Sequence, residues 1–271
     1  MLLLQVSLTP SEGKRLIGMS VAQMDAVQHA LREGVIVVAT STTTGYVLEE
    51  LLKKEVPDKG LFTAGVVTAR GCCITDPEKR YGHRVIRRGE VSEVGTSDLP
   101  EVLAGMGPND VFVKGANAID PFGQAGILLG GVGGGTIGRS WGYIAANGIT
   151  TIIAVGLEKL VPVSLSDAAA KTGIESVDRS LGMAVGMMVV TGNIITEMEA
   201  LKMLTGVDAI PIGSGGIGGG EGSKTFVLEG PEENVQVAYD LVCSIKGEPA
   251  LSTTVQRCDL CDAKCDYNPS K

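Results

Sequence analysis

The sequence predicts an α/β protein with an open, mostly parallel sheet and helices on both faces, followed by a small C-terminal α+β subdomain and a cysteine-containing tail. Three observations favour this class. Gly34–Ala39 is a run of Val and Ile, and Thr151–Val155 is an apolar run of similar length. Such runs are typical of strands that are buried on both faces of a parallel sheet. Helical patterns alternate with these strands, as they do in βαβ units.

Composition limits the kind of protein. The chain has 271 residues, of which 44% are hydrophobic and 20% are charged. That is enough for one large domain or for a core with a smaller companion. The net charge of −8 argues against nucleic acid or an anionic membrane as the main partner. We therefore expect a small-molecule partner.

The location is expected to be cytoplasmic. No apolar run reaches the roughly 18 residues that span a bilayer, and the first residues lack the basic and apolar regions of a secretory signal. Six cysteines in a long chain without an export signal fit a reducing compartment better than a disulfide framework.

Local patterns place the elements along the chain. After an N-terminal edge strand, Thr9-Pro10-Ser11-Glu12 has the form of a capping box and predicts the start of a helix. Helices are expected at about Ser20–Arg32, Tyr46–Lys54, Ser164–Lys171, Ser180–Val190, Ile194–Leu204 and Pro231–Ile245. Further strands are expected at Leu61–Ala69, His83–Ile86, Val91–Val94, Val111–Val113, Ala209–Ile212 and Lys224–Leu228. We divide the chain into an α/β core (residues 1–165), an α+β subdomain (166–250) and a tail (251–271).

The segment Asp110–Pro162 is the main candidate for a functional site. A short apolar strand ends at Lys114, and a polar turn with Asn117 and Asp120 follows it. In open α/β sheets, polar residues just past the carboxyl end of a strand face the ligand crevice. Lys114 is hard to explain as core filling, because an unpaired buried ammonium is costly. We expect it to bind an anion or to act as a base with a lowered pKa, unless Asp120 neutralises it.

Two loops are candidates for binding an anion. The hydroxyl-rich loop Ser41–Thr44 follows a strand and precedes a helix, which predicts a phosphate-binding loop or, alternatively, simple helix capping. The glycine cluster Gly131–Gly135 would let the backbone approach a phosphate, or would allow tight helix–sheet packing. The expected ligand-binding residues are Ser41, Thr42, Thr43, Thr44, Asp120, Gly131, Gly133, Gly134, Gly135 and Arg139.

Four motifs follow one another in a familiar order: GVIVVATSTTTGYVLEEL, KGANAIDP, GGVGGG and IAANGITTIIAVGLEKLV. This series, over about residues 20–165, resembles the superfamily of ribose-5-phosphate isomerase, glucosamine-6-phosphate deaminase, CoA transferases and the lactate-utilization proteins. The run Ala154–Pro162 resembles the lactate-utilization branch most. The resemblance implies a phosphate loop after the first strand of the sheet and, by analogy, a homo-oligomer, but no defined reaction.

The resemblance does not extend to the isomerase chemistry. The isomerase uses two aspartates of its turn, a lysine before the glycines and a glutamate after them. The corresponding residues here are Lys114, Asn117, Leu128 or Leu129, and Ser140. Lysine and serine cannot replace a carboxylate base, so pentose-phosphate isomerisation is not expected. The CoA-transferase resemblance implies a nucleophilic glutamate in a glycine-lined loop, for which Glu221 is the candidate, although the order of elements differs. The catalytic candidates are Lys114, Asn117 and Glu221.

Cys258, Cys261 and Cys265 have C-x2-C-x3-C spacing. Three thiolates so close in sequence can converge on one metal ion or cluster, so we expect zinc or an iron–sulfur cluster here. The fourth ligand would be Cys243, Cys72, Cys73, His83 or a nearby carboxylate. The alternatives are a mobile tail of free thiols and an oxidised cysteine pair.

Two classes of function follow from these features. In the first, the crevice binds a small phosphorylated or carboxylated metabolite or a CoA-type nucleotide, with an undefined reaction. In the second, the protein is a non-catalytic sensor or assembly protein, and the cysteines make it responsive to metal or redox state. The loss of the isomerase carboxylates favours the second class. The polar residues at every crevice position favour the first, which we prefer.

Overall fold

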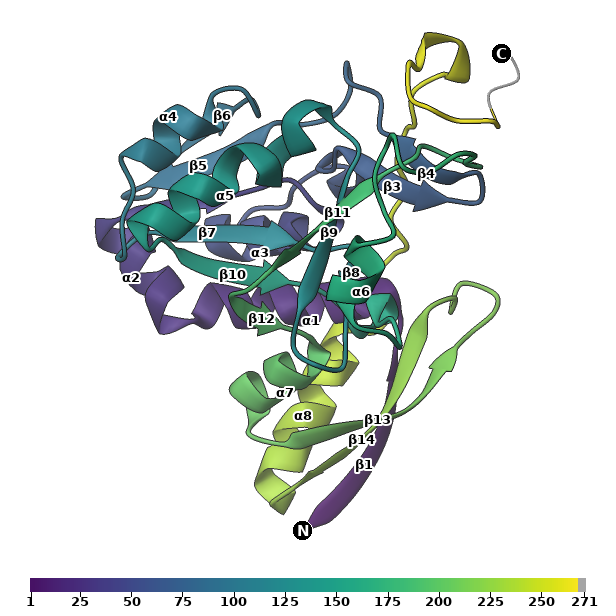
Figure 1. The fold of residues 1–271 in the computed structure, drawn as a ribbon. Helices are drawn as coiled ribbons and strands as arrows, with labels where there is room; N and C mark the ends of the chain where they lie inside the picture. Colours follow the sequence, from purple (N-terminus) through teal and green to yellow (C-terminus); the bar gives the residue numbers. More distant parts are fainter. Residues whose placement is uncertain (268–271) are drawn as a thin grey trace.

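The protein is a mixed α/β fold around a six-stranded sheet (Figure 1). The computed structural model describes residues 1–267, so the last four residues of the predicted tail lie outside the described part. The strands of the sheet, in spatial order, are β12 (Asn193–Ile195), β10 (Thr150–Ala154), β7 (Val111–Gly115), β2 (Val35–Val38), β5 (His83–Arg87) and β6 (Glu90–Val94). Within residues 1–267, no helix has the length and apolarity needed to cross a membrane.

The sheet contains both parallel and antiparallel pairs. The neighbours β12–β10, β10–β7 and β7–β2 are parallel, whereas β2–β5 and β5–β6 are antiparallel. The β7 strand is buried along its whole length, as its Val-Phe-Val sequence predicts. The predicted strands at Gly34–Ala39 and Thr151–Val155 and the predicted β5–β6 hairpin are confirmed.

Helices pack on the sheet in two groups. The helices α1 (Pro10–Gln23), α2 (Asp25–Glu33) and α3 (Thr42–Leu52) contact one another, and α4 (Leu99–Ala104) contacts α5 (Gly135–Asn147). In Figure 1, α5 lies in front of the sheet and α3 lies behind it. The predicted capping box begins α1: the Thr9 hydroxyl accepts a hydrogen bond from the Glu12 amide, and the Glu12 carboxylate accepts one from the Thr9 amide.

A second sheet joins the two ends of the chain, in the order β1-β14-β13. The N-terminal β1 (Leu2–Leu8) pairs antiparallel with β14 (Ser223–Gly230), which also pairs with β13 (Asp208–Gly215). The helices α7 (Glu197–Thr205) and α8 (Glu232–Ile245) pack against this sheet (Figure 1). The predicted division at residue 165 therefore places β1 and β14, two neighbours of one sheet, in different segments.

The structure corrects one predicted helix and two helix boundaries. At the first of these boundaries, the predicted helix Ile194–Leu204 begins only at Glu197, because Ile194 and Ile195 belong to β12. Ser180–Val190 does not form a helix, because its last residues form β11 (Gly186–Val190). This strand pairs with β9 (Ala125–Leu129), which in turn pairs with β8 (Ala118–Ile119). Two glycines and a Met-Met-Val-Val run favour an extended backbone over a helix here. The predicted helix over about Ser20–Arg32 is divided, because the extended backbone of Met24 separates α1 from α2.

The remaining elements are short. The hairpin of β3 (Gly65–Thr68) and β4 (Gly71–Ile74) and the helix α6 (Leu165–Ala169) complete the named strands and α-helices. The predicted strand Leu61–Ala69 is thus shorter than expected. Its first residue, Leu61, ends a 3-10 turn that begins at Lys59, and β3 begins only at Gly65.

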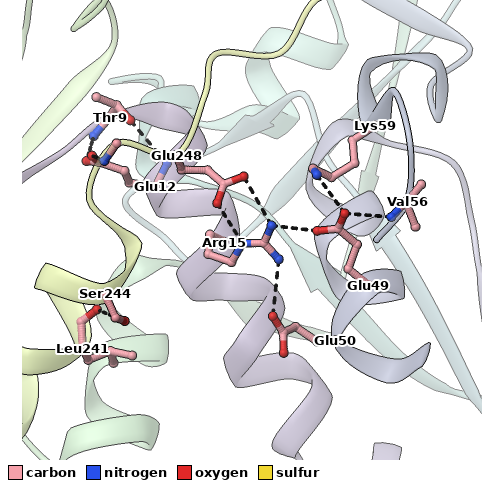
Figure 2. A network of polar contacts seen from close by, with 11 residues as sticks. Thr9, Glu12, Arg15, Glu49, Glu50, Val56, Lys59, Leu241, Ser244 and Glu248 are labelled. Atoms are coloured by element: carbon pink, nitrogen blue, oxygen red, sulfur yellow. Dashed lines mark hydrogen bonds and ion pairs between the residues drawn. The ribbon is translucent and has the colours of Figure 1, made fainter. Parts of the chain in front are cut away.

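A network of charged side chains connects α1, α3 and the segment that follows α8 (Figure 2). Arg15 on α1 pairs with Glu49 at 2.7 Å, with Glu50 at 3.3 Å and with Glu248 at 3.0 Å. Its guanidinium also lies 4.7 Å from the centre of the Tyr46 ring. Burial alone would lower the pKa of Arg15, but Glu248 and Glu49 outweigh that effect and raise it. The network fixes the position of α1 and α3, and α3 carries one of the candidate loops.

Candidate functional site: a cationic cavity at the strand ends

A cavity of about 660 Å³ opens where β2 and β7 end. Its walls come from the loop before α3, the end of β7, the glycine segment before α5 and the β3–β4 hairpin. The predicted site residues that line it are Ser41, Thr42, Lys114, Asn117, Gly131, Gly134, Gly135 and Arg139. The crevice predicted from the sequence therefore corresponds to a real cavity, and two separate segments of the chain meet in it.

Every charged side chain that lines this cavity is cationic. Within the described part of the chain, its walls contain no aspartate and no glutamate. The cationic residues are Lys14, Arg80, Lys114, Arg139 and Lys159. This concentration of positive charge occurs in a protein whose net charge is −8. The charge of these walls therefore favours a small anion over a cation.

Lys114 is buried at the end of β7, and its side chain turns toward backbone carbonyls. Its Nζ donates to the carbonyl oxygen of Thr40 at 3.2 Å and to that of Gly115 at 3.4 Å. Burial, and then the charge of Lys159, lower the pKa of Lys114 to about 8. Among the described residues, no carboxylate offsets this charge. Asp120 therefore does not neutralise Lys114, and an anion in the cavity would be its counter-charge.

Lys159 and Lys14 form a second cationic edge of the cavity. The Nζ of Lys159 donates to the carbonyl oxygen of Ala116 at 2.9 Å, and burial lowers the pKa of this lysine. The Nζ of Lys14 pairs with Oε1 of Glu158 at 2.9 Å. The other carboxylate oxygen of Glu158 is buried and accepts no hydrogen bond within the described chain. Glu158, which does not line the cavity, therefore balances part of the positive charge of Lys14 at this edge.

Glu197, the first residue of α7, is a second carboxylate behind the same wall. Its Oε2 accepts a hydrogen bond from the Leu157 amide at 2.8 Å. Burial, and then the nearby charge of Glu158, raise the pKa of Glu197 to about 7. Both carboxylates crowd the backbone at Gly156, where a β-carbon would lie 1.9 Å from Glu158 Oε2 and 2.8 Å from Glu197 Oε1. Two like charges so close explain why one of them holds its proton strongly.

The loop before α3 caps the helix and also lines the cavity. Ser41 is the N-cap residue, and its Oγ accepts a hydrogen bond from the Thr44 amide at 3.1 Å. The Thr44 hydroxyl donates to the carbonyl oxygen of Ala39 at 2.6 Å. The Thr40 amide donates to Nδ1 of the buried His83 at 3.0 Å. These bonds fix the loop with the N-terminus of α3 toward the cavity, where the helix dipole favours an anion.

The glycine segment approaches the cavity from the opposite wall. Gly133, Gly134 and Gly135 all have positive φ, between 59° and 78°, a conformation that costs other residues free energy. Gly134 is the N-cap of α5 and has no side chain to cap the helix, while the Gly134 and Gly135 amides donate to the carbonyl oxygens of Gly131 and Val132. At Gly138, a β-carbon would lie 2.1 Å from the carbonyl oxygen of Gly133. Some of these glycines therefore allow tight packing and others line the cavity, and their approach to a phosphate stays a prediction.

Several predicted residues lie elsewhere. The carboxylate of Asp120 accepts hydrogen bonds from the backbone amides of Phe122, Gln124 and Leu165, at 2.9 to 3.0 Å, so it orders the polar turn. Glu221 is exposed in the β13–β14 hairpin, and its carboxylate accepts a hydrogen bond from the Gly219 amide. The predicted residues that do not line this cavity are Thr43, Thr44, Asp120, Gly133, Glu221, Cys258, Cys261 and Cys265.

The chain matches no protein-family model, no curated protein and no solved structure. The assignment of a function therefore depends on the chemistry of the cavity itself.

Asn117 is a neutral polar residue of the cavity wall. Its Oδ1 accepts a hydrogen bond from the Leu128 amide at 3.0 Å. It holds β9 in place and leaves the side-chain amide at the cavity wall.

Sequence reasoning missed some of the residues that define the site. Lys114 is the fourth residue of β7 and Lys159 lies five residues after β10, so both lysines come near the carboxyl end of a buried strand, and that criterion could have found Lys159 as well. Arg80 also lines the cavity and is not among the predicted site residues. Lys14 and Glu197 lie on helices with no local pattern that marks them, because only tertiary packing brings them to the site.

Proposed function

We propose that the protein binds a small anionic metabolite, phosphorylated or carboxylated, in the cavity between the loop before α3 and the glycine segment before α5. The observation that carries this proposal is the charge of the cavity: all of its charged lining residues are cationic, and Lys114 is buried without a carboxylate partner. An ammonium is costly to bury unless it is paired, and a bound anion would pair it.

The size and the backbone of the cavity support the same function. Its volume of about 660 Å³ lies within the range of about 300–1,000 Å³ that is typical of small-molecule sites. The N-termini of α3 and α5, helices of 11 and 13 residues, both border it. Amides at helix N-termini bind phosphate and carboxylate groups. A CoA-type nucleotide would have to place its phosphates here and extend outward.

We also propose that the sheet is an open, doubly wound frame of the isomerase and CoA-transferase type, with residues 166–250 as a smaller subdomain. The parallel order β10-β7-β2 and the motifs at the strand ends support this relationship. The reaction stays undefined, because Lys114 and Asn117 stand where the isomerase has carboxylates. Lys114 is the best candidate for a base, since a pKa of about 8 leaves part of it neutral near that pH. Homo-oligomerisation stays a prediction.

Thermal melting with a panel of anions tests the proposal: phosphate, pyrophosphate, ribose 5-phosphate, citrate and CoA. A ligand at about 100 times its Kd stabilises the folded state by about 2.7 kcal/mol, or about 5–10 °C for a chain of this size. Lys114→Met should abolish the shift. Lys54→Met removes the same charge at an exposed position near the other end of α3 and should keep it. If no anion of the panel stabilises the wild-type protein, the proposal fails.

A second candidate is a non-catalytic protein that responds to metal or redox state through its cysteines. The observation that favours it is that the three tail cysteines line one small cavity together with Cys72 and Cys73. Anion binding and this second role are compatible, because the two cavities share part of one wall.

A further inference from the structure

A second cavity, of about 40 Å³, lies between the β3–β4 hairpin and the C-terminal segment. Five of the six cysteines line it: Cys72 and Cys73 from β4, and Cys258, Cys261 and Cys265 from the tail. The first two are more than 180 residues away from the others in sequence. The fold, and not the local motif alone, therefore brings them together.

Backbone hydrogen bonds hold the cysteine-containing tail against the rest of the protein. On one side of the motif, the Gln256 amide donates to the carbonyl oxygen of Ile74 at 2.9 Å. On the other side, the Ala184 amide donates to the carbonyl oxygen of Lys264 at 3.0 Å, and the Asp266 amide donates to that of Ser180 at 2.7 Å. The segment between these anchors is therefore fixed at both ends. These contacts place residues 256–266 against the fold and argue against the alternative of a mobile tail.

Among the described residues, Arg70 is the one charged side chain that lines this cavity. Its Nη1 donates to Sγ of Cys258 at 3.6 Å. A metal centre would bind the cysteine sulfurs as thiolates, since coordination deprotonates a thiol outright.

We propose that the cysteine-lined cavity binds one thiolate metal centre, zinc or an iron–sulfur cluster, through Cys258, Cys261, Cys265 and either Cys72 or Cys73. Both kinds of centre take four cysteine thiolates. In residues 1–267, no group of three or more Cys, His, Asp or Glu side chains is already arranged around a metal position. Binding therefore requires the cysteine sulfurs to move toward one another within the shared cavity.

Two other candidates for the fourth ligand fail on geometry. Cys243 is exposed on α8 and does not line this cavity. Both ring nitrogens of His83 have partners in the protein, the Thr40 amide at Nδ1 and the Thr96 hydroxyl at Nε2, each at 3.0 Å. The fourth ligand is thus assigned to β4.

The centre would also form part of the wall of the anion cavity. Cys72, Cys73, Ile74 and Met183 line both cavities. A metal that ties β4 to the tail would keep this shared wall in place. Loss of the centre should therefore weaken anion binding, although no ligand of the centre lies near Lys114 in sequence.

Metal analysis of the full-length protein, purified without oxygen, tests the proposal. We expect either about one zinc per chain, or iron together with acid-labile sulfide, and these two results distinguish the two kinds of centre. Cys261→Ser should lose most of the metal, and Cys243→Ser, the matched control, should keep it. Less than about a tenth of an atom per chain, in protein whose thiols are reduced, would overturn the proposal. Equal retention in both variants would overturn it too.

A second measurement covers the case in which Cys261→Ser does not fold. Cobalt(II) added to metal-free wild-type protein should give thiolate-to-cobalt charge-transfer absorption with one cobalt per chain, because cobalt(II) occupies tetrathiolate zinc sites. Cys243→Ser should give the same titration. A wild-type protein that is folded, reduced and shows no such absorption contradicts the site. This readout does not depend on anion binding, so it can fail or succeed independently of the proposed function.

Discussion

Replacing Lys114 with methionine should make the protein more stable and abolish its anion binding. The pKa of Lys114 is lowered from 10.5 to about 8, first by burial and then by Lys159. Each pKa unit corresponds to about 1.4 kcal/mol, so the buried charge costs the folded state about 3 kcal/mol at neutral pH. Methionine keeps the apolar length but leaves two carbonyl oxygens without a donor, at about 1 kcal/mol each. The expected net gain is about 1–2 kcal/mol.

The gain depends on pH in a defined direction. Between about pH 8 and 10.5, the unfolded wild-type chain binds a proton on Lys114 that the folded chain has released. Wild-type stability therefore rises with pH through this window. Lys114→Met lacks this rise, so its advantage should shrink by pH 10. Urea unfolding at pH 7 and pH 10 measures the difference, with the single tryptophan, Trp141, as the fluorescent probe.

One result would refute this reasoning. If Lys114→Met loses more than about 3 kcal/mol at pH 7, Lys114 belongs to a stabilising buried network, as breaking such networks costs about this much. The charge of Lys114 would then stabilise the fold itself, and no bound anion would be needed to balance it. Lys54→Met, at an exposed position, should change stability by no more than about 0.5 kcal/mol and controls for the loss of net charge.

Three further predictions concern the charged groups. Pyrophosphate binding at pH 8.5 should take up as much as about one proton, because the anion raises the pKa of Lys114; calorimetry in two buffers of different ionisation enthalpy measures this, and proton release would contradict it. Arg15→Met should cost about 3 kcal/mol in urea unfolding, because it removes the cation that pairs with Glu248 and one of the two cations that pair with the buried Glu49, whereas the exposed Lys202→Met should cost little; similar losses would contradict the network. The pKa of Glu197 is raised from 4.5 to about 7, so the folded state binds more protons in that window and its stability falls as pH rises through it. Glu197→Gln should therefore be more stable than wild type at pH 8 but not at pH 4.5, and an equal gain at both would contradict the raised pKa.

Local physical rules predicted the elements that carry the site. The capping box at Thr9 and Glu12 needs only residues three apart, so the start of α1 was predictable. The buried strands β2 and β7 were predictable because short apolar runs rich in Val are typical of strands buried on both faces of a parallel sheet. Lys114 was found because a lysine at the end of such a strand conflicts with burial.

Other features depend on tertiary structure that the sequence does not display. Met-Met-Val-Val fits a buried helix or a strand, so β11 was predicted as a helix. Lys14 reaches the cavity only because α1 packs beside it. Cys72 and Cys73 could be named as metal ligands only among alternatives, since no local spacing connects them to the tail cysteines.

The position of a bound anion tests the central claim most directly. Tungstate carries the charge and shape of phosphate and can be located in a crystal from its anomalous scattering. We predict a tungstate within hydrogen-bond distance of the loop Ser41–Thr42 or of the N-terminus of α5, close enough to Lys114 to balance its charge. Tungstate bound only at the outer surface, in crystals that leave this cavity open, would contradict it.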